Sequence, residues 1–109
     1  MEKLTYSEEL VMKSIWDLNK EPVLSEIVSH VNTNYCEESW KPQTVSTFLA
    51  RLVRKGYLKL KRNGKIYTYE VLISERDYRR MLYLHIIDFW YKGDKKLFLN
   101  DLLTNKMEE

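Results

Sequence analysis

The sequence has little cysteine, proline or glycine, with one, two and three residues respectively among 109. Its single cysteine, Cys36, excludes an intramolecular disulfide framework, and the Cys-x-x-Cys pairs of a zinc site are absent. Long apolar runs are absent too, because charged residues interrupt even the most apolar N-terminal stretch, residues 6–18. The sequence therefore predicts neither a signal peptide nor a membrane-spanning helix. These absences favour a small cytoplasmic protein that holds no metal and no cofactor.

Aromatic side chains are plentiful by contrast, with 3 Trp, 8 Tyr and 3 Phe. Together with the low glycine and proline content, they are typical of a folded chain rather than a disordered one. A length of 109 residues suits one domain, or a small domain with an appendage. A domain of this size buries only about two-thirds of its unfolded surface, so a partner subunit would add to its stability.

The basic residues are concentrated in one segment, although the net charge of the chain is only +2. Residues 39–69 contain eight basic residues and no acidic one, whereas the segments before and after carry balances of −5 and −1. A polyanion is the natural partner of such a segment. The alternative is a solvated basic face that has no ligand.

Apolar residues recur at helical spacing in three segments of the first half of the chain. The first predicted helix, residues 6–18, follows Thr5, and Glu8 lies three residues further on, as a capping box requires. A shorter helix is predicted over residues 24–32. The third, residues 42–55, has a proline at its first position, where the missing N–H costs nothing.

The second half of the chain predicts a hairpin and two more helices. Strands are expected over residues 58–62 and 65–71, around Asn63-Gly64, which is a strong signal for a two-residue hairpin loop. Helices are expected over residues 74–93 and 94–106.

This order predicts a mainly α fold with a small antiparallel β-hairpin. Three helices followed by a hairpin are typical of a winged helix-turn-helix, which we assign to residues 1–72. The last two helices, residues 73–109, are predicted to form a C-terminal helical dimerisation region.

The third predicted helix has side chains suited to the major groove of DNA. A recognition helix needs short polar and cationic side chains near its N-terminus, where hydroxyls and amides reach bases or phosphates. The predicted hairpin tip adds three cations, Lys61, Arg62 and Lys65, which would hold neighbouring phosphates. The residues predicted to contact DNA in the major groove, called the reading residues below, are Gln43, Thr44, Ser46, Thr47 and Arg51.

The last two predicted helices carry more apolar side chains than two helices can cover by themselves. A second copy of the chain would cover them in a two-fold dimer, and such a dimer would match a two-fold operator. The alternative is that they pack onto the winged helix of the same chain. The predicted dimerisation residues are Leu82, Ile86, Phe89, Trp90, Leu97, Phe98 and Leu102.

The sequence shows no catalytic apparatus, so we predict that the protein is not an enzyme. It has no Ser/His/Asp set and no phosphate-binding glycine loop. His30 and His85 are far apart in sequence, and the glutamates beside Cys36 would raise its pKa. The three tryptophans, Trp16, Trp40 and Trp90, are interpreted as core anchors.

Three ordered motifs along residues 4–72 point to a known family. They are Leu4-Thr5 with Glu8 and the run 11–16, then WKPQTVST at residues 40–47 leading to KGYL at 55–58, and NGKIYTY at 63–69. With these motifs the chain resembles the BlaI/MecI penicillinase-repressor family, part of the wider BlaI/MecI/CopY group. The remainder is more loosely similar, at Ser74, 77–78, Phe89, 91–93 and 97–102.

The resemblance implies a dimeric transcriptional repressor that binds palindromic operators in double-stranded DNA, upstream of β-lactamase or other antibiotic-resistance genes. It also implies release through a membrane sensor-protease, which leads to cleavage of the repressor in its C-terminal helices. By the same resemblance, operator contacts fall on Lys41, Gln43, Thr44, Thr47 and Arg51, with Arg62 and Lys65 on the wing.

The chain departs from the family pattern at several places. Lys41 precedes Pro42, where the family often has a capping serine. The family's cleaved bond joins Asn to Phe, whereas the matching Asn100 is followed here by Asp101. The chain ends short of the last helix found in longer members. With one cysteine, it also lacks the C-terminal cysteine cluster of the copper-responsive branch.

Two other functions remain open at this point. One is a winged-helix module that docks onto an acidic protein partner, and the other is a repressor that responds to an unrelated signal. No small-molecule substrate is expected for any of them.

Overall fold

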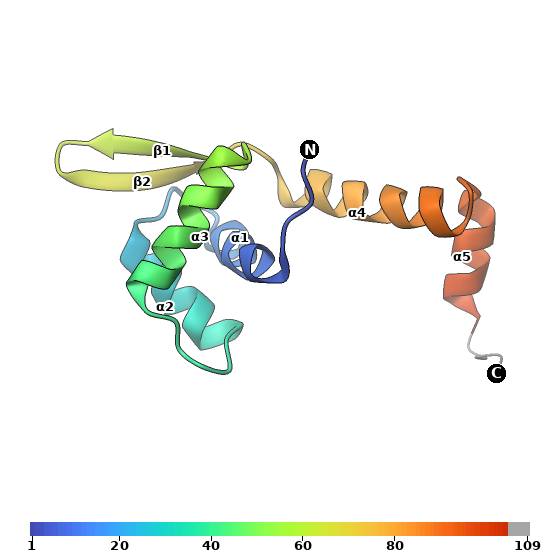
Figure 1. Cartoon of the computed structure of the whole chain (residues 1–109), viewed down its shortest axis with the longest axis horizontal. Helices are drawn as coiled ribbons and strands as arrows, with labels where there is room; N and C mark the ends of the chain where they lie inside the picture. The colour runs from blue at the N-terminus through green and yellow to red at the C-terminus, as the bar shows by residue number, and fades with distance from the viewer. Residues whose placement is uncertain (105–109) are drawn as a thin grey trace. The chain divides into compact units, whose positions relative to one another are not determined.

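The computed structural model describes residues 1–104 and divides the chain into two compact units. The first unit, called the winged unit below, comprises Met1–Glu75, and the second begins at Arg76. The elements, labelled in Figure 1, are α1 (Tyr6–Leu18), α2 (Leu24–Asn34), α3 (Pro42–Arg54), β1 (Leu58–Asn63), β2 (Ile66–Val71), α4 (Glu75–Trp90) and α5 (Lys95–Leu103). No helix within this described part is long and apolar enough to cross a membrane.

Helix α1 begins with the predicted capping box. The Thr5 hydroxyl accepts from the Glu8 N–H at 3.3 Å, and the Glu8 carboxylate accepts from the Thr5 N–H at 2.9 Å. The apolar residues predicted at helical spacing here are Val11, Met12, Ile15, Trp16 and Leu18. The first three are fully buried, whereas Trp16 and Leu18 are half-buried. The helix and its capping box are confirmed.

Helix α2 is two residues longer than predicted, since residues 33 and 34 continue it. Backbone N–H groups of Tyr35 and Cys36 both donate to the Val31 carbonyl, at 2.9 and 3.1 Å, and so close the last turn. At the other end, Val23 has no acceptor in its side chain. The Glu26 carboxylate instead accepts from the Val23 N–H at 3.0 Å.

Helix α3 buries Val45, Leu49 and Leu52 against α1 and α2. These three helices form the core of the winged unit. The helix ends before Gly56, whose φ of +83° is a left-handed conformation that favours glycine. Gly56 therefore turns the chain from α3 into β1.

Strands β1 and β2 form the predicted antiparallel hairpin, which extends away from the three helices (Figure 1). Its loop differs from the prediction by one residue. Asn63 pairs with Ile66, so the two loop residues are Gly64 and Lys65, and not Asn63 and Gly64. Among Asn63, Gly64 and Lys65, only Gly64 has a positive φ, at +67°. Glycine adopts this conformation without strain, so the first loop position suits Gly64 better than Asn63.

The second unit contains most of α4 and all of α5. The Asp94 side chain caps α5 by accepting from the Leu97 N–H at 3.0 Å, and the Tyr91 hydroxyl donates to Asp101 at 2.5 Å. The helix ends at Leu103, before the predicted end at Lys106, which lies outside the described residues.

One of the three tryptophans, Trp90, is not the core anchor within this chain that was predicted. The Trp90 side chain is 73% exposed at the end of α4, whereas Trp16 and Trp40 are half-buried. An apolar pattern identifies the side chains that favour burial, but it does not show whether the same chain buries them.

Candidate nucleic-acid interface

The predicted reading residues lie on the exposed side of α3. Its polar and cationic side chains alternate with the buried Val45 and Leu49 at helical spacing. Seven of the eight predicted DNA-contacting residues are exposed, and the eighth, Thr44, is half-buried. The exposed seven are Lys41, Gln43, Ser46, Thr47, Arg51, Arg62 and Lys65.

The Thr47 hydroxyl already has a partner inside the helix. It donates to the Gln43 carbonyl at 3.0 Å, one turn earlier. Its proton is therefore engaged, and its oxygen remains able to accept. Thr47 is thus suited to accept from a base amino group or to contact a thymine methyl.

The N-terminus of α3 has no side-chain cap. Lys41 occupies the capping position and makes no capping hydrogen bond, and Pro42 follows it. The positive end of the helix dipole and the Lys41 ammonium therefore lie together at an exposed position. Such a helix end favours a phosphate group.

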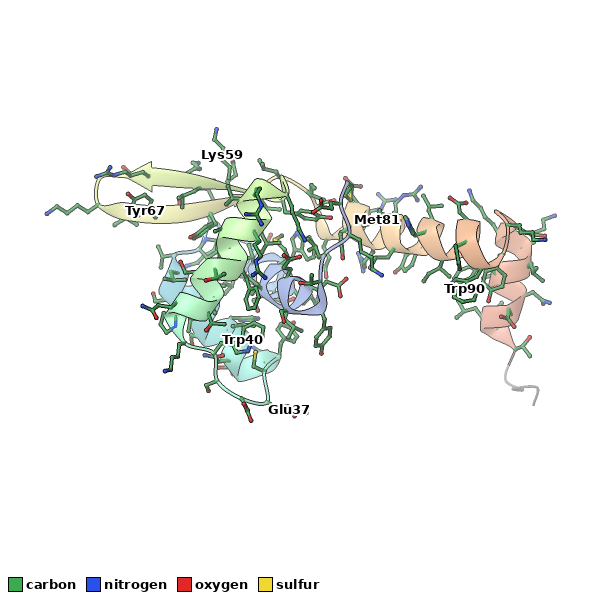
Figure 2. All side chains as sticks on the ribbon, in the orientation of Figure 1. Glu37, Trp40, Lys59, Tyr67, Met81 and Trp90 are labelled. Carbon is green, nitrogen blue, oxygen red and sulfur yellow. The ribbon has the colours of Figure 1, made fainter. Side chains whose placement is uncertain are left out.

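The Arg51 guanidinium lies over an aromatic ring. Its Cζ atom is 5.6 Å from the centroid of the Phe48 ring, one turn earlier in α3. The Phe48 ring in turn packs against Trp40, with 5.1 Å between ring centroids and a 45° angle between planes. Trp40 lies near the helices of the winged unit in Figure 2.

Asn32, on α2, holds Trp40 through both backbone polar groups of that residue. The Asn32 amide nitrogen donates to the Trp40 carbonyl at 3.0 Å, and its amide oxygen accepts from the Trp40 N–H at 2.8 Å. Sequence reasoning missed this pair. The only signal was an asparagine at the predicted end of the second helix, and asparagine is common there for other reasons.

The wing also holds its arginine in place. The Arg62 Nε donates to the Gly64 carbonyl at 2.9 Å, and the Arg62 Cζ atom is 5.7 Å from the centroid of the Tyr67 ring on the facing strand. Figure 2 labels Tyr67 on the hairpin. Lys65 follows Gly64 in the loop and is exposed.

The basic segment is partly neutralised by carboxylates from the preceding part of the chain. The Lys55 ammonium lies 2.6 Å from Glu8, and the Lys61 ammonium lies 2.9 Å from Glu21. These hydrogen bonds raise the pKa of both lysines. Within residues 1–104, the other six basic side chains of the segment form no ion pair, so the cationic surface is narrower than the sequence suggests.

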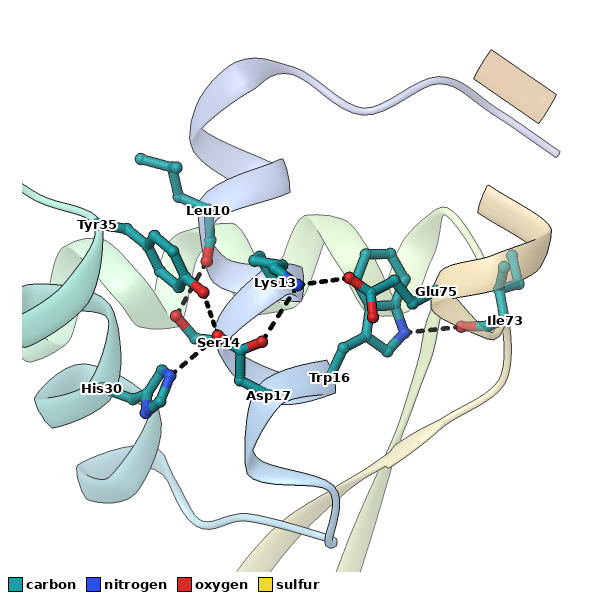
Figure 3. A network of polar contacts seen from close by, with 9 residues as sticks. All are labelled: Leu10, Lys13, Ser14, Trp16, Asp17, His30, Tyr35, Ile73 and Glu75. Atoms are coloured by element: carbon teal, nitrogen blue, oxygen red, sulfur yellow. Dashed lines mark hydrogen bonds and ion pairs between the residues drawn. The ribbon is translucent and has the colours of Figure 1, made fainter. Parts of the chain in front are cut away.

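A separate polar network joins α1, α2 and Glu75 (Figure 3). Asp17 accepts from Tyr35 and contacts His30 at 3.1 Å and Lys13 at 3.2 Å, and Lys13 also binds Glu75 at 2.6 Å. Burial on its own raises the pKa of Asp17, but the hydrogen bonds from Tyr35, His30 and Lys13 outweigh it and lower that pKa. His30 therefore helps to pack α2 onto α1.

Other candidate chemical groups do not converge on a site. No cluster of three or more histidine, cysteine or acidic residues that could hold a metal occurs in the part of the chain described. His85 is exposed on α4. Burial raises the pKa of Cys36, so the pKa moves in the expected direction, but the cause is not the neighbouring glutamates.

The predicted dimerisation residues belong to the second unit, and most are exposed there. Phe89 is 74% exposed and Leu102 is 66% exposed. Leu82 and Phe98 are half-buried, and Phe98 packs against Tyr91 with 5.4 Å between ring centroids. The other exposed members are Ile86, Trp90 and Leu97.

Sequence comparison identifies relatives along nearly the whole chain. The family model described as Penicillinase repressor matches residues 4–109. The methicillin resistance regulatory protein MecI of Staphylococcus aureus strain N315 is 29% identical over 107 residues, covering 98% of this chain and 80% of that protein. The penicillinase repressor of Bacillus licheniformis is 30% identical over 109 residues, covering 97% of this chain and 77% of that protein.

Two solved structures resemble the fold. One is the solution structure of monomeric Bacillus licheniformis BlaI in complex with the blaP half-operator, with a TM-score of 0.57 and 30% identity, covering 71% of this chain and 89% of that chain. The other is the solution structure of the DNA binding domain of the repressor BlaI, with a TM-score of 0.56 and 32% identity. The match covers 72% of this chain and 94% of that chain. The predicted winged helix is thereby confirmed as a fold.

Proposed function

The chain belongs to the penicillinase repressor family, and on that premise we propose that it is a sequence-specific transcriptional repressor of β-lactamase or other antibiotic-resistance genes. The observation that carries the proposal is the exposed polar and cationic side of α3, in a winged unit that resembles BlaI bound to a half-operator. An operator lies inside the bacterial cell, so the proposal places this protein in the cytoplasm. In this proposal the protein binds DNA and does not catalyse a reaction.

In this proposal α3 enters the major groove. Gln43, Ser46 and Thr47 contact base edges, and Arg51 reads a guanine or holds a phosphate. Thr44, half-buried, contributes from the edge of the same surface. Lys41 and the uncapped N-terminus of α3 bind a backbone phosphate.

The wing contributes affinity and not sequence selectivity. Arg62 and Lys65 are exposed cations on a projecting hairpin, which suits them to bind neighbouring phosphates. Such contacts fix the position of the protein on the duplex and make its binding sensitive to salt.

We assign DNA binding to residues 1–72 and dimerisation to residues 73–109. The exposed apolar side chains of α4 and α5 support this assignment, because a second copy of the chain would cover them. A two-fold dimer presents two α3 helices to a palindromic operator, so the operator is expected to be a palindrome.

Release by a membrane sensor-protease is the relief pathway that the family suggests. Asn100 and Asp101 are both exposed on α5, which would give a protease access after local unfolding. Because Asp101 stands where the family has phenylalanine, a signal other than β-lactam is the second candidate.

A gel-shift experiment tests the proposal. The purified protein is titrated against its own promoter region and against random DNA of equal length, at two salt concentrations. We expect promoter-selective binding that weakens as salt rises. Equal affinity for both DNAs, or no binding to either, would contradict the proposal and favour a protein-docking module.

A further inference from the structure

We propose that Asn32, Trp40 and Phe48 are positioning residues that orient the Arg51 guanidinium for base reading, and so set sequence selectivity without contacting DNA. This inference rests on the proposed DNA-binding function and extends it to three residues that the reading surface itself does not include. It is carried by three successive links, the first made of two hydrogen bonds, which run from α2 through the turn to the exposed side of α3.

The last contact favours one orientation of the Arg51 guanidinium. A long arginine side chain on a helix surface samples many rotamers, and ordering it on binding lowers affinity. The Phe48 ring, 5.6 Å from the Arg51 Cζ atom, is within the distance at which a cation is attracted to an aromatic face. No carboxylate in residues 1–104 forms an ion pair with Arg51, so its donors stay available to a base.

The ring that holds Arg51 is itself held. Phe48 and Trp40 are both half-buried, and their tilted rings lie 5.1 Å apart, in the range typical of stabilising aromatic pairs. Trp40 precedes α3 and belongs to no helix or strand. Its position therefore depends on an anchor from elsewhere.

Asn32 is that anchor, and its chemistry is specific. One side-chain amide both donates to the Trp40 carbonyl and accepts from the Trp40 N–H, which uses the two ends of the amide at once. An aspartate has the same shape, but its carboxylate cannot donate to the carbonyl and would repel it. Asparagine is thus the residue that this contact requires.

The expected consequence is selective. A guanidinium held in one orientation can form two parallel hydrogen bonds to the O6 and N7 atoms of guanine. A guanidinium without its ring partner keeps its charge and still binds phosphates. Loss of the contact between the Phe48 ring and the Arg51 guanidinium should therefore lower the affinity for the operator more than the affinity for random DNA.

A double-mutant cycle tests this mechanism in the full chain. Phe48→Leu keeps an apolar side chain but removes the ring, whereas Phe48→Tyr keeps the ring. Fluorescence anisotropy at one salt concentration gives the affinity for the promoter region that contains the operator and the affinity for random DNA of equal length. The measured quantity is the ratio of these two affinities. We expect Phe48→Leu to lower this ratio by about 3- to 10-fold and Phe48→Tyr to preserve it. In an Arg51→Ala background, Phe48→Leu should lower it no further.

The anchor is tested by a matched pair on α2. Asn32→Asp should lower the same ratio by about 3- to 10-fold, as Phe48→Leu does. Asn34→Asp introduces the same charge two residues away, where the side chain donates to the His30 carbonyl, and should leave the ratio unchanged. Val53→Ala, at a half-buried position of α3, controls for general destabilisation.

Each outcome has a distinct meaning. Equal effects of Phe48→Leu with and without Arg51 would overturn the proposal, because the ring would then not act through the guanidinium. Equal effects of Asn32→Asp and Asn34→Asp would overturn the role of the anchor. A wild-type chain that binds operator and random DNA equally would instead refute the proposed function, before any variant is compared.

Discussion

The Glu8 carboxylate and the Lys55 ammonium lie 2.6 Å apart and join the first turn of α1 to the residue that caps α3. Glu8 is only 1% exposed, although it is charged. It also closes the capping box with Thr5. A buried charge of this kind is stable only while its partners remain in place.

The first prediction concerns this buried carboxylate. Glu8→Ala removes the acceptor for the Thr5 N–H and the partner of Lys55, so it should lower the free energy of unfolding by about 1–3 kcal/mol. Urea denaturation followed by circular dichroism measures the change. Glu37→Ala, in the exposed loop before α3, is the control and should stay within about 0.5 kcal/mol of the wild type. A Glu8→Ala variant as stable as the control would refute this role.

The second prediction is a loss of stability in acid. Burial on its own raises the pKa of Glu8, but hydrogen bonds from Lys55 and Thr5 outweigh it, so the folded-state pKa lies below the ordinary value of 4.5. The stabilisation is therefore fully present above about pH 4.5 and is lost as the pH falls through the lower folded-state value. The free energy of unfolding, measured across this range, should fall more steeply for the wild type than for Glu8→Gln. Parallel curves would contradict it.

The third prediction separates phosphate binding from base reading. Arg62→Ala should weaken binding to operator and random DNA by the same factor, because a wing phosphate contact carries no sequence information. The slope of log affinity against log salt should decrease in magnitude by about 1. Lys59→Ala, on a neighbouring exposed lysine of β1 (Figure 2), shows whether the effect belongs to the wing tip. A loss confined to the operator would assign base reading to Arg62 instead.

The fourth prediction concerns self-association. Phe89→Asp places a charge in the exposed apolar surface of α4 and should weaken dimerisation by at least about tenfold, as measured by analytical ultracentrifugation. Affinity for a full palindrome should fall with it, while affinity for a half-site should not. Tyr6 on α1 is equally exposed, at 74%, so Tyr6→Asp is the matched control. A Phe89→Asp chain that still dimerises like this control would contradict the assignment.

Local features of the fold could be predicted from the sequence because their signals lie within a few residues of one another. Thr5 and Glu8 are three positions apart, and Gly56 marks the end of α3. The predicted position of the hairpin loop was wrong by one residue. An Asn-Gly pair signals a turn, but the choice of register depends on the whole strand pairing, which places Asn63 opposite Ile66.

Contacts between distant residues left no such signal. Glu8 and Lys55 are 47 residues apart, and the Asn32 amide meets Trp40 across a loop without periodicity. The charge pattern predicted a basic surface but could not show that Lys55 and Lys61 are paired with carboxylates. The exposure of Trp90 depends on what covers α4, which an apolar pattern does not specify. The reading and dimerisation residues remain predictions.

The most direct test of the central claim compares operator and random DNA for a variant of the α3 surface. Thr44→Ala combined with Thr47→Ala removes two side chains of that surface without changing the charge. Fluorescence anisotropy should show operator affinity reduced by about tenfold and random-DNA affinity nearly unchanged, because base contacts specify and phosphate contacts do not. Equal losses on both DNAs would show that this side of α3 does not read sequence.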